Sequence, residues 1–169
     1  ILDRVEHLDD IMLFCRADIT TKKPDNVKKN ISKFKREEKR MNEDPYGPIP
    51  NHAKLRLESG NLVLCMGVRL GRTADIARIA RAAGFDSLFV DMEHSPITTE
   101  SASQICTAAL DVGVTPLVRV PGHEHHHATR VLDCGAMGVI VPHVDTVDQA
   151  RKCVLNCKFP PIGQRSVSG

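Results

Sequence analysis

Between residues 62 and 157, short apolar runs alternate four times with segments that have helical spacing. The apolar runs are LVLCMGVRL (62–70), SLFVDMEH (87–94), TPLVRVP (115–121) and GVIVPHV (138–144). The helical segments between and after them cover residues 73–84, 98–113, 127–135 and 146–157. Strands that are apolar along nearly their whole length are typical of parallel sheets covered by helices. The alternation therefore predicts an α/β fold with the order βαβαβαβα.

The ends of these helices are marked by residues with known end preferences. Thr73, Thr98 and Thr146 stand where an N-cap side chain would accept a backbone hydrogen bond. Gly84 and Gly113 stand where a helix ends in a left-handed residue. The repeat of about 25 residues suits a (β/α) barrel or an open doubly wound sheet. No GxGxxG motif follows the first strand, so nothing supports a dinucleotide site, but periodicity leaves both architectures open.

The first 45 residues have a different character from the rest. They are rich in charge and contain no glycine, and the sequence DPYGPIP (44–50) then interrupts regular structure. We expect a helical, basic segment over residues 1–45, a linker and a leading helix over 46–60, and an α/β domain over 61–169. Two helices are predicted in this segment, the first from apolar residues at helical spacing between Leu2 and Phe14 and the second over residues 27–41, which has few apolar positions.

Composition excludes several classes of protein. Hydrophobic residues make up 41% of the 169 residues and the formal charge is only +2, which does not favour nucleic acid or a membrane surface. No segment reaches the roughly 20 apolar residues of a membrane span. Six cysteines without a CxxC pair indicate reduced thiols and a cytoplasmic protein. The chain starts without Met or a signal peptide, so we expect it to be a piece of a longer protein.

Polar side chains stand at the ends of three consecutive predicted strands. They are Asp91, Glu93 and His94 on the second, Arg119 on the third, and His143 and Asp145 on the fourth. In a (β/α) barrel the carboxyl ends of the strands carry the active site. A charge buried there is costly unless it is paired or used. Three such ends in succession favour a functional site.

His94 and Arg119 also have a purely structural interpretation, as does Asp133 at the end of the third predicted helix. His94 suits a general base, or it only caps the following turn. Arg119 suits a carboxylate ligand, or it only forms an ion pair with Glu93 or Asp91. Asp133, before CGAMG, could set the tautomer of a histidine, although a solvated helix-end acid is the simpler interpretation.

The sequence HEHHH (123–127) raises the question of a metal site. Adjacent histidines point in different directions, and only His123 and His127 would share a helical face. Zinc-finger spacings are absent. We therefore interpret the run as a surface loop rather than a metal site.

Four motifs, in order and spacing, resemble one known family. AGFDSLFVDMEHSP, PLVRVP, RVLDCGAMGVIVPHVDTVDQAR and KFPPIGQRS are similar to the dihydroxyheptenedioate aldolase/citrate lyase (HpcH/HpaI aldolase) family over about 120 residues. The resemblance implies a TIM (β/α) barrel, of which this chain holds about four βα units. It also implies a class II, metal-dependent carbon–carbon lyase that cleaves a 4-hydroxy-2-oxo acid to pyruvate and an aldehyde.

The resemblance also implies roles for individual residues. The His of DxEH, here His94, is the acid/base, and the Asp of LDxG, here Asp133, orients it. Arg119, in VRVP, binds the pyruvate carboxylate and keto oxygen and stabilises the enolate. Gly163 and Arg165, in PPIGQR, border the substrate site.

The resemblance further implies a divalent cation, Mg, Mn or Co. In the family its Glu and Asp ligands lie on strands after PPxGxRS, so no residue of this chain is predicted as a metal ligand. The alternative to the aldolase is therefore an inactive half barrel or a binding module. A homo-oligomer is expected from the family.

Residues 1–42 resemble a different protein class. LDDIMLFCRADITTKKPDNVKKNISKFKREEKRMNE is similar to a C-terminal helical stretch of bacterial tRNA nucleotidyltransferases. None of the residues for nucleotidyl transfer lies in this stretch. Its basic helix could contact phosphates, which gives an RNA-associated protein as a further alternative, but a solvated charged face is the expected interpretation.

Overall fold

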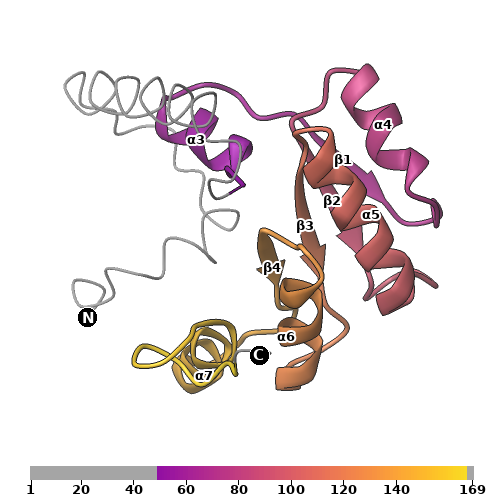
Figure 1. The fold of residues 1–169 in the computed structure, drawn as a ribbon. Helices are drawn as coiled ribbons and strands as arrows, with labels where there is room; N and C mark the ends of the chain where they lie inside the picture. The colour runs from indigo at the N-terminus through magenta and orange to yellow at the C-terminus, as the bar shows by residue number, and fades with distance from the viewer. Residues whose placement is uncertain (1–48, 167–169) are drawn as a thin grey trace.

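A computed structural model describes residues 49–166, which form one parallel sheet with helices around it (Figure 1). The strands are β1 (Cys65–Val68), β2 (Ser87–Asp91), β3 (Thr115–Arg119) and β4 (Gly138–Ile140), and they pair in the order β1-β2-β3-β4. The helices are α3 (His52–Glu58), α4 (Asp75–Ala82), α5 (Thr99–Asp111), α6 (His125–Asp133) and α7 (Val147–Cys157). The predicted alternation of strands and helices is confirmed.

One face of the sheet builds the core with α4, α5 and α6. Alternate residues of a strand point to opposite faces, so Leu88 and Val90 of β2 and Val118 of β3 share the helix-covered face. All three side chains are fully buried in a cluster with small residues of the helices, such as Ala77 and Ala109. Small residues let the helices approach the sheet closely, and the aliphatic composition suits this packing.

The opposite face has three layers of side chains that follow the strand register. At the amino ends lie Cys65, Ser87 and Thr115, above them Gly67, Phe89, Leu117 and Gly138, and at the carboxyl ends Asp91, Arg119 and Ile140. The α3 helix lies at the amino ends, because the Ala53 backbone N–H donates to Thr115 Oγ1 at 3.0 Å. The strand order never reverses, as it would in a doubly wound sheet, so the arrangement is that of a partial (β/α) barrel.

Most of the predicted helix ends are confirmed. Thr98 and Thr146 each accept a backbone N–H as N-caps, and Thr146 forms a full capping box with Gln149. Gly84 has a φ of 81° and Gly113 a φ of 70°. Both values are in the left-handed region expected after a helix. The prediction for Thr73 was wrong: α4 begins at Asp75 after Ala74, and no side chain caps it.

Several predictions concern residues that the structure does not describe. The helical basic segment over residues 1–45 and the tRNA nucleotidyltransferase resemblance of residues 1–42 lie outside residues 49–166. Within the described part, the cysteines carry free thiols and none of the helices is long and apolar enough to cross a bilayer.

Candidate active site

An ion pair between a buried aspartate and a partly buried arginine joins the carboxyl ends of β2 and β3. Asp91 and Arg119 are register partners on neighbouring strands. Arg119 donates from Nε to Asp91 Oδ1 at 3.0 Å and from Nη2 to Oδ2 at 2.7 Å. This two-pronged geometry fixes a guanidinium most firmly. The guanidinium also lies over the Phe89 ring, 5.4 Å from its centroid, which adds a cation–π contact. Arg119 therefore has one well-defined position.

The surroundings of Asp91 favour its ionised form. Its side chain is 1% exposed, and besides Arg119 it accepts the backbone N–H groups of Glu93 and His94 at 3.0 and 3.1 Å. The hydrogen bond from Arg119 is the main reason that the pKa of Asp91 falls to about 2, against the opposing effect of burial. The same bond raises the pKa of Arg119. Asp91 thus organises the turn that follows β2.

Glu93 connects this pair to two histidines. Its Oε2 lies 3.1 Å from Arg119 Nε, and its Oε1 lies 2.9 Å from His143 Nε2 and 3.5 Å from His94 Nε2. The carboxylate is only 10% exposed, although both imidazoles face outward. Glu93 therefore contacts groups from three successive βα units.

His94 is positioned by its backbone and is accessible at its ring. Its carbonyl oxygen accepts from Arg69 Nη2 at 2.8 Å, and Arg69 Nε lies 3.6 Å from Asp91 Oδ2. The side chain is 58% exposed. The turn also carries Ser95, whose hydroxyl donates to the Asp91 carbonyl and accepts from the backbone of Ile97. An accessible imidazole beside a fixed guanidinium can exchange a proton with an anionic ligand held between them.

Asp133, predicted to orient His94, lies at the other end of the sheet. It is the last residue of α6, and the following turn places the Met137 backbone N–H on the Pro116 carbonyl, at the start of β3. Asp91, Glu93, His94, Arg119 and His143 form the strand-end cluster. Each strand residue advances about 3.3 Å, so the length of β3 separates Asp133 from this cluster by roughly 10 Å or more. The structure does not bring Asp133 to His94 of the same chain, because a helix that follows a strand returns to the amino ends.

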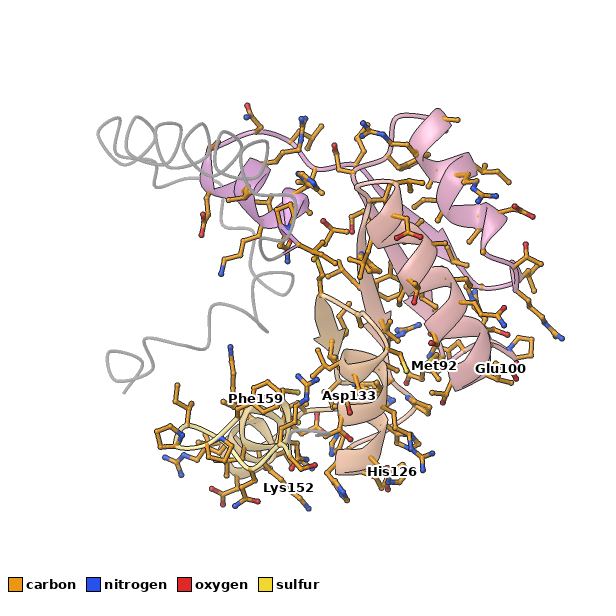
Figure 2. All side chains as sticks on the ribbon, in the orientation of Figure 1. Met92, Glu100, His126, Asp133, Lys152 and Phe159 are labelled. Carbon is orange, nitrogen blue, oxygen red and sulfur yellow. The ribbon has the colours of Figure 1, made fainter. Side chains whose placement is uncertain are left out.

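Asp133 instead holds Arg165. Arg165 Nη2 donates to Asp133 Oδ1 at 2.5 Å, and its guanidinium lies 4.6 Å from the centroid of the Phe159 ring. Figure 2 labels Asp133 on α6 and Phe159 after α7, the two segments that Arg165 joins. Gly163 lies in the same loop, where its N–H donates to the Phe159 carbonyl. The two predicted substrate-binding residues of PPIGQR are therefore apart from His94 and Arg119.

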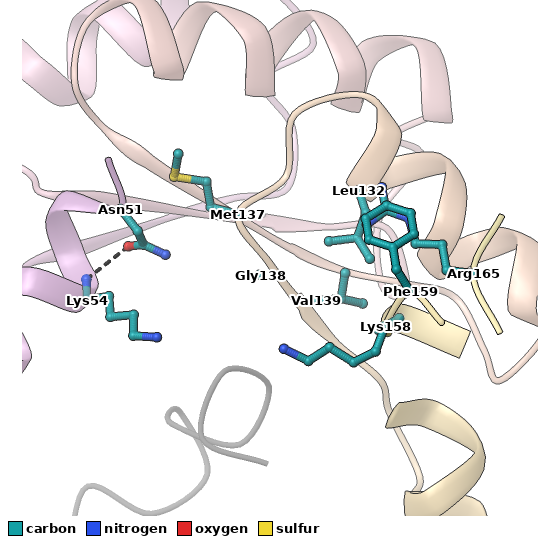
Figure 3. A pocket seen from close by; sticks show the side chains of 10 residues that line it. Asn51, Lys54, Leu132, Met137, Gly138, Val139, Lys158, Phe159 and Arg165 are labelled. Carbon is teal, nitrogen blue, oxygen red and sulfur yellow. Dashed lines mark hydrogen bonds between the residues drawn. The ribbon is translucent and has the colours of Figure 1, made fainter. Parts of the chain in front are cut away.

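A cavity of about 380 Å³ adjoins Arg165 at the amino ends of the strands (Figure 3). It is lined by α3, by the start of β4 and by the loop after α7, with Lys54, Val139, Lys158 and Phe159 among its walls. The strand-end cluster contributes none of the lining residues. This hollow is thus separate from the candidate active site.

The histidine run forms no metal site in the described part of the chain. His123 Nε2 lies 2.5 Å from the Pro142 carbonyl oxygen, and His127 Nε2 lies 3.5 Å from a Glu124 oxygen. Among residues 49–166, no group of three His, Cys, Asp or Glu side chains could hold a metal ion. His125 begins α6, so the run is the start of a helix rather than a loop.

Glu93 and His143 belong to the cluster but were not assigned roles from the sequence. Both were visible as polar residues at strand ends. What the sequence could not give is the meeting of residues 50 positions apart. The available signal was indirect. Consecutive strands of a parallel sheet pair side by side, so the carboxyl ends of β2, β3 and β4 lie together.

Comparison with known proteins agrees with this architecture. A family model described as HpcH/HpaI aldolase/citrate lyase matches residues 69–169. The chain belongs to the HpcH/HpaI aldolase/citrate lyase family. The match takes in Asp91, Glu93, His94 and Arg119 at the strand ends, and it also takes in the Asp133–Arg165 pair.

Relatives in the HpcH/HpaI family carry aldolase names. The chain is 46% identical over 115 residues to a 4-hydroxy-4-methyl-2-oxoglutarate aldolase of Hapsidospora irregularis, covering 68% of this chain and 43% of that protein. It is 34% identical over 119 residues to a 2-keto-3-deoxy-L-rhamnonate aldolase of Escherichia coli O157:H7, covering 70% of this chain and 44% of that protein. The chain thus spans less than half the length of these relatives.

A solved structure supports the same fold. The crystal structure of an HpcH/HpaI aldolase from Desulfitobacterium hafniense DCB-2 matches with a TM-score of 0.65 and 36% identity, over 69% of this chain and 45% of that one. The four βα units therefore correspond to part of a known family fold, and the assignment as a partial barrel is confirmed.

Proposed function

We propose that the chain carries part of the active site of a class II pyruvate aldolase-type lyase. The reaction is reversible cleavage of a 4-hydroxy-2-oxo acid to pyruvate and an aldehyde. The observation that supports this function is the accessible His94 beside the rigidly held Arg119, at the carboxyl ends of β2 and β3. Within a family whose named relatives are aldolases, we assign His94 as acid/base and Arg119 as the pyruvate ligand.

Arg119 keeps donors for a ligand although it is paired. A guanidinium has five N–H groups, and the contacts to Asp91 and Glu93 use those of Nε and Nη2. Asp91 holds the plane of the group, so the Nη1 side is fixed in direction. Donors fixed before the reaction stabilise the negative charge that develops on an enolate without reorganising.

The net charge of the strand-end cluster is relevant to whether the reaction requires a divalent cation. Asp91 and Glu93 are offset by Arg119 and Arg69, so an oxo-acid anion would add uncompensated negative charge. This balance supports a requirement for a divalent cation, Mg, Mn or Co. The described residues do not fit it, because Asp91 and Glu93 are engaged by Arg119 and no three-residue donor set exists among residues 49–166.

The domain division and the second ion pair complete the proposal. We assign residues 61–169 to the first half of a (β/α)8 barrel, with 46–60 as linker and leading helix. Asp133, Arg165 and Gly163 fix the loop after α7 rather than touch the substrate of their own chain.

We also propose a homo-oligomer, which sedimentation velocity would detect as a species heavier than one chain.

Exchange of the pyruvate methyl protons with deuterated water tests the function without a known aldehyde. We expect NMR to show exchange that needs Mg, Mn or Co and is lost in His94→Ala. His125→Ala is the matched control, because His125 is an exposed histidine on α6 outside the cluster, and it should exchange as the unchanged chain does. Exchange that survives His94→Ala would refute the role of His94. A folded chain without exchange would show that these residues alone do not form a working site.

A further inference from the structure

The side chain of Glu93 is the one carboxylate of the strand-end cluster that contacts two imidazoles. Its oxygen Oε1 lies near Nε2 of both His143 and His94, while Oε2 lies near Arg119. We propose that Glu93 is a positioning residue that shares one carboxylate oxygen between His94 and His143, and so sets which imidazole nitrogen carries the proton. The catalytic consequence rests on the function proposed above, but the positioning itself does not.

The distances describe unequal sharing. His143 Nε2 is at 2.9 Å and His94 Nε2 is at 3.5 Å. The first is a full hydrogen bond, whereas the second is beyond the usual range for N–H···O. Since an ionised carboxylate only accepts, a neutral imidazole bound through Nε2 must carry its proton there. His143 thus takes the Nε2–H tautomer, and His94 is drawn to the same tautomer more weakly.

The backbone of His143 indicates that this contact is maintained. His143 has a φ of 55°, the only positive φ of a non-glycine residue within residues 49–166. Such a conformation costs of order 1 kcal/mol or more and persists where surrounding contacts determine it. The bond from the ring to Glu93 ties this residue to the end of β2.

Glu93 itself is held firmly enough to position other groups. Arg119 fixes its Oε2, and Arg119 is in turn fixed by Asp91. Arg69, from the first βα unit, also contacts this group: it forms an ion pair with Asp91 and donates a hydrogen bond to the His94 carbonyl. Asp133, the other candidate to orient His94, is occupied by Arg165 at the opposite end of β3. Within residues 49–166, Glu93 is therefore the carboxylate that lies within ion-pair distance of the His94 ring.

Nitrogen NMR of the imidazole rings tests the sharing without any turnover. The chain would be labelled with ¹⁵N, and long-range ¹H–¹⁵N spectra would report the tautomers of His94 and His143, assigned by single histidine substitutions. We expect His143 in the Nε2–H form. In Glu93→Gln, both rings should shift toward the tautomer mixture of a free imidazole.

A matched control exists on α6. Glu124 lies 3.5 Å from His127 on the surface, so Glu124→Gln should alter His127 alone. Unchanged signals from both His94 and His143 in a folded Glu93→Gln chain would overturn the proposal.

A second variant keeps the test decisive if Glu93→Gln fails to fold. His143→Asn leaves Glu93 in place and removes the preferred partner, so His94 should gain Nε2–H character. A His94 spectrum that does not respond would refute the sharing. A tautomer response in a chain that shows no pyruvate exchange would retain the positioning role and reject only the proposed function.

Discussion

Two pairs of Asp and Arg stand at opposite ends of the same sheet and differ in surroundings. Asp91 is 1% exposed and meets Arg119 through two hydrogen bonds between neighbouring strands. Asp133 is 44% exposed and meets Arg165 through one contact between a helix end and a loop. In the first pair Arg119 also contacts Glu93, whereas in the second pair Arg165 also packs on the ring of Phe159.

The difference shows why the same pair of residue types does different work. A charge out of water must be matched by a partner in fixed geometry, so the strand-end pair is rigid and costly to break. In the second pair the arginine is mostly buried but the aspartate is half exposed, so water screens the carboxylate and its charge contributes less. Rigid, matched charge with one accessible histidine suits a reaction site, while the second pair suits the attachment of a loop.

The largest effect should come from breaking the buried pair. In Asp91→Ala the guanidinium of Arg119 loses its main partner and two backbone N–H groups lose their acceptor. We expect a loss of about 3–5 kcal/mol in the free energy of unfolding, measured with urea. Asp133→Ala, measured in parallel, should cost far less. Equal losses would mean that burial does not distinguish the pairs.

The lowered pKa of Asp91 should make the stability of the folded chain depend on pH in the acid range. Asp91 has a pKa of about 2 in the folded chain, below the value of about 3.9 of a free Asp. Because the folded-state pKa is lower, its contribution is complete above about pH 4 and is lost as pH falls toward about 2. We expect roughly 2 kcal/mol from this residue, seen as a steeper acid loss of stability than in Asp91→Asn. Parallel pH profiles would contradict the assignment.

Gly163 sharpens the comparison at the second pair. An added Cβ there would clash with the carbonyl oxygen of Lys158 and lie 2.7 Å from that of Leu155, and backbone atoms cannot easily move away. We expect Gly163→Ala to cost about 2 kcal/mol by thermal or urea unfolding. Gly67→Ala is the matched control, since a Cβ added at Gly67 would have no atom within 4 Å apart from those of its own residue and its chain neighbours. A tolerated alanine at 163 would show that the loop packs differently.

The sequence predicted the sheet better than it predicted the site. Apolar runs such as SLFVD predict a buried strand because the pattern of apolar residues is contained in a few neighbouring positions, and Gly84 marks a helix end by its own conformation. Arg119 and His94 were placed at strand ends for the same reason. The contact of His143 with Glu93 and the distance of Asp133 from His94 depend on how strands and returning helices meet in space, which no local pattern contains.

The smallest effect is expected from the exposed partner of the second pair. Asp133→Asn keeps the shape of the side chain and removes its charge, while Arg165 retains the face of Phe159. We expect a loss of at most about 1 kcal/mol in the free energy of unfolding, which should shrink further in high salt because the Asp133 carboxylate is half exposed. Arg165→Ala should cost more than Asp133→Asn, since it also removes the packing on Phe159. If Asp133→Asn instead approached the loss in Asp91→Ala, and salt left it unchanged, the second pair would be as tightly coupled to the fold as the first.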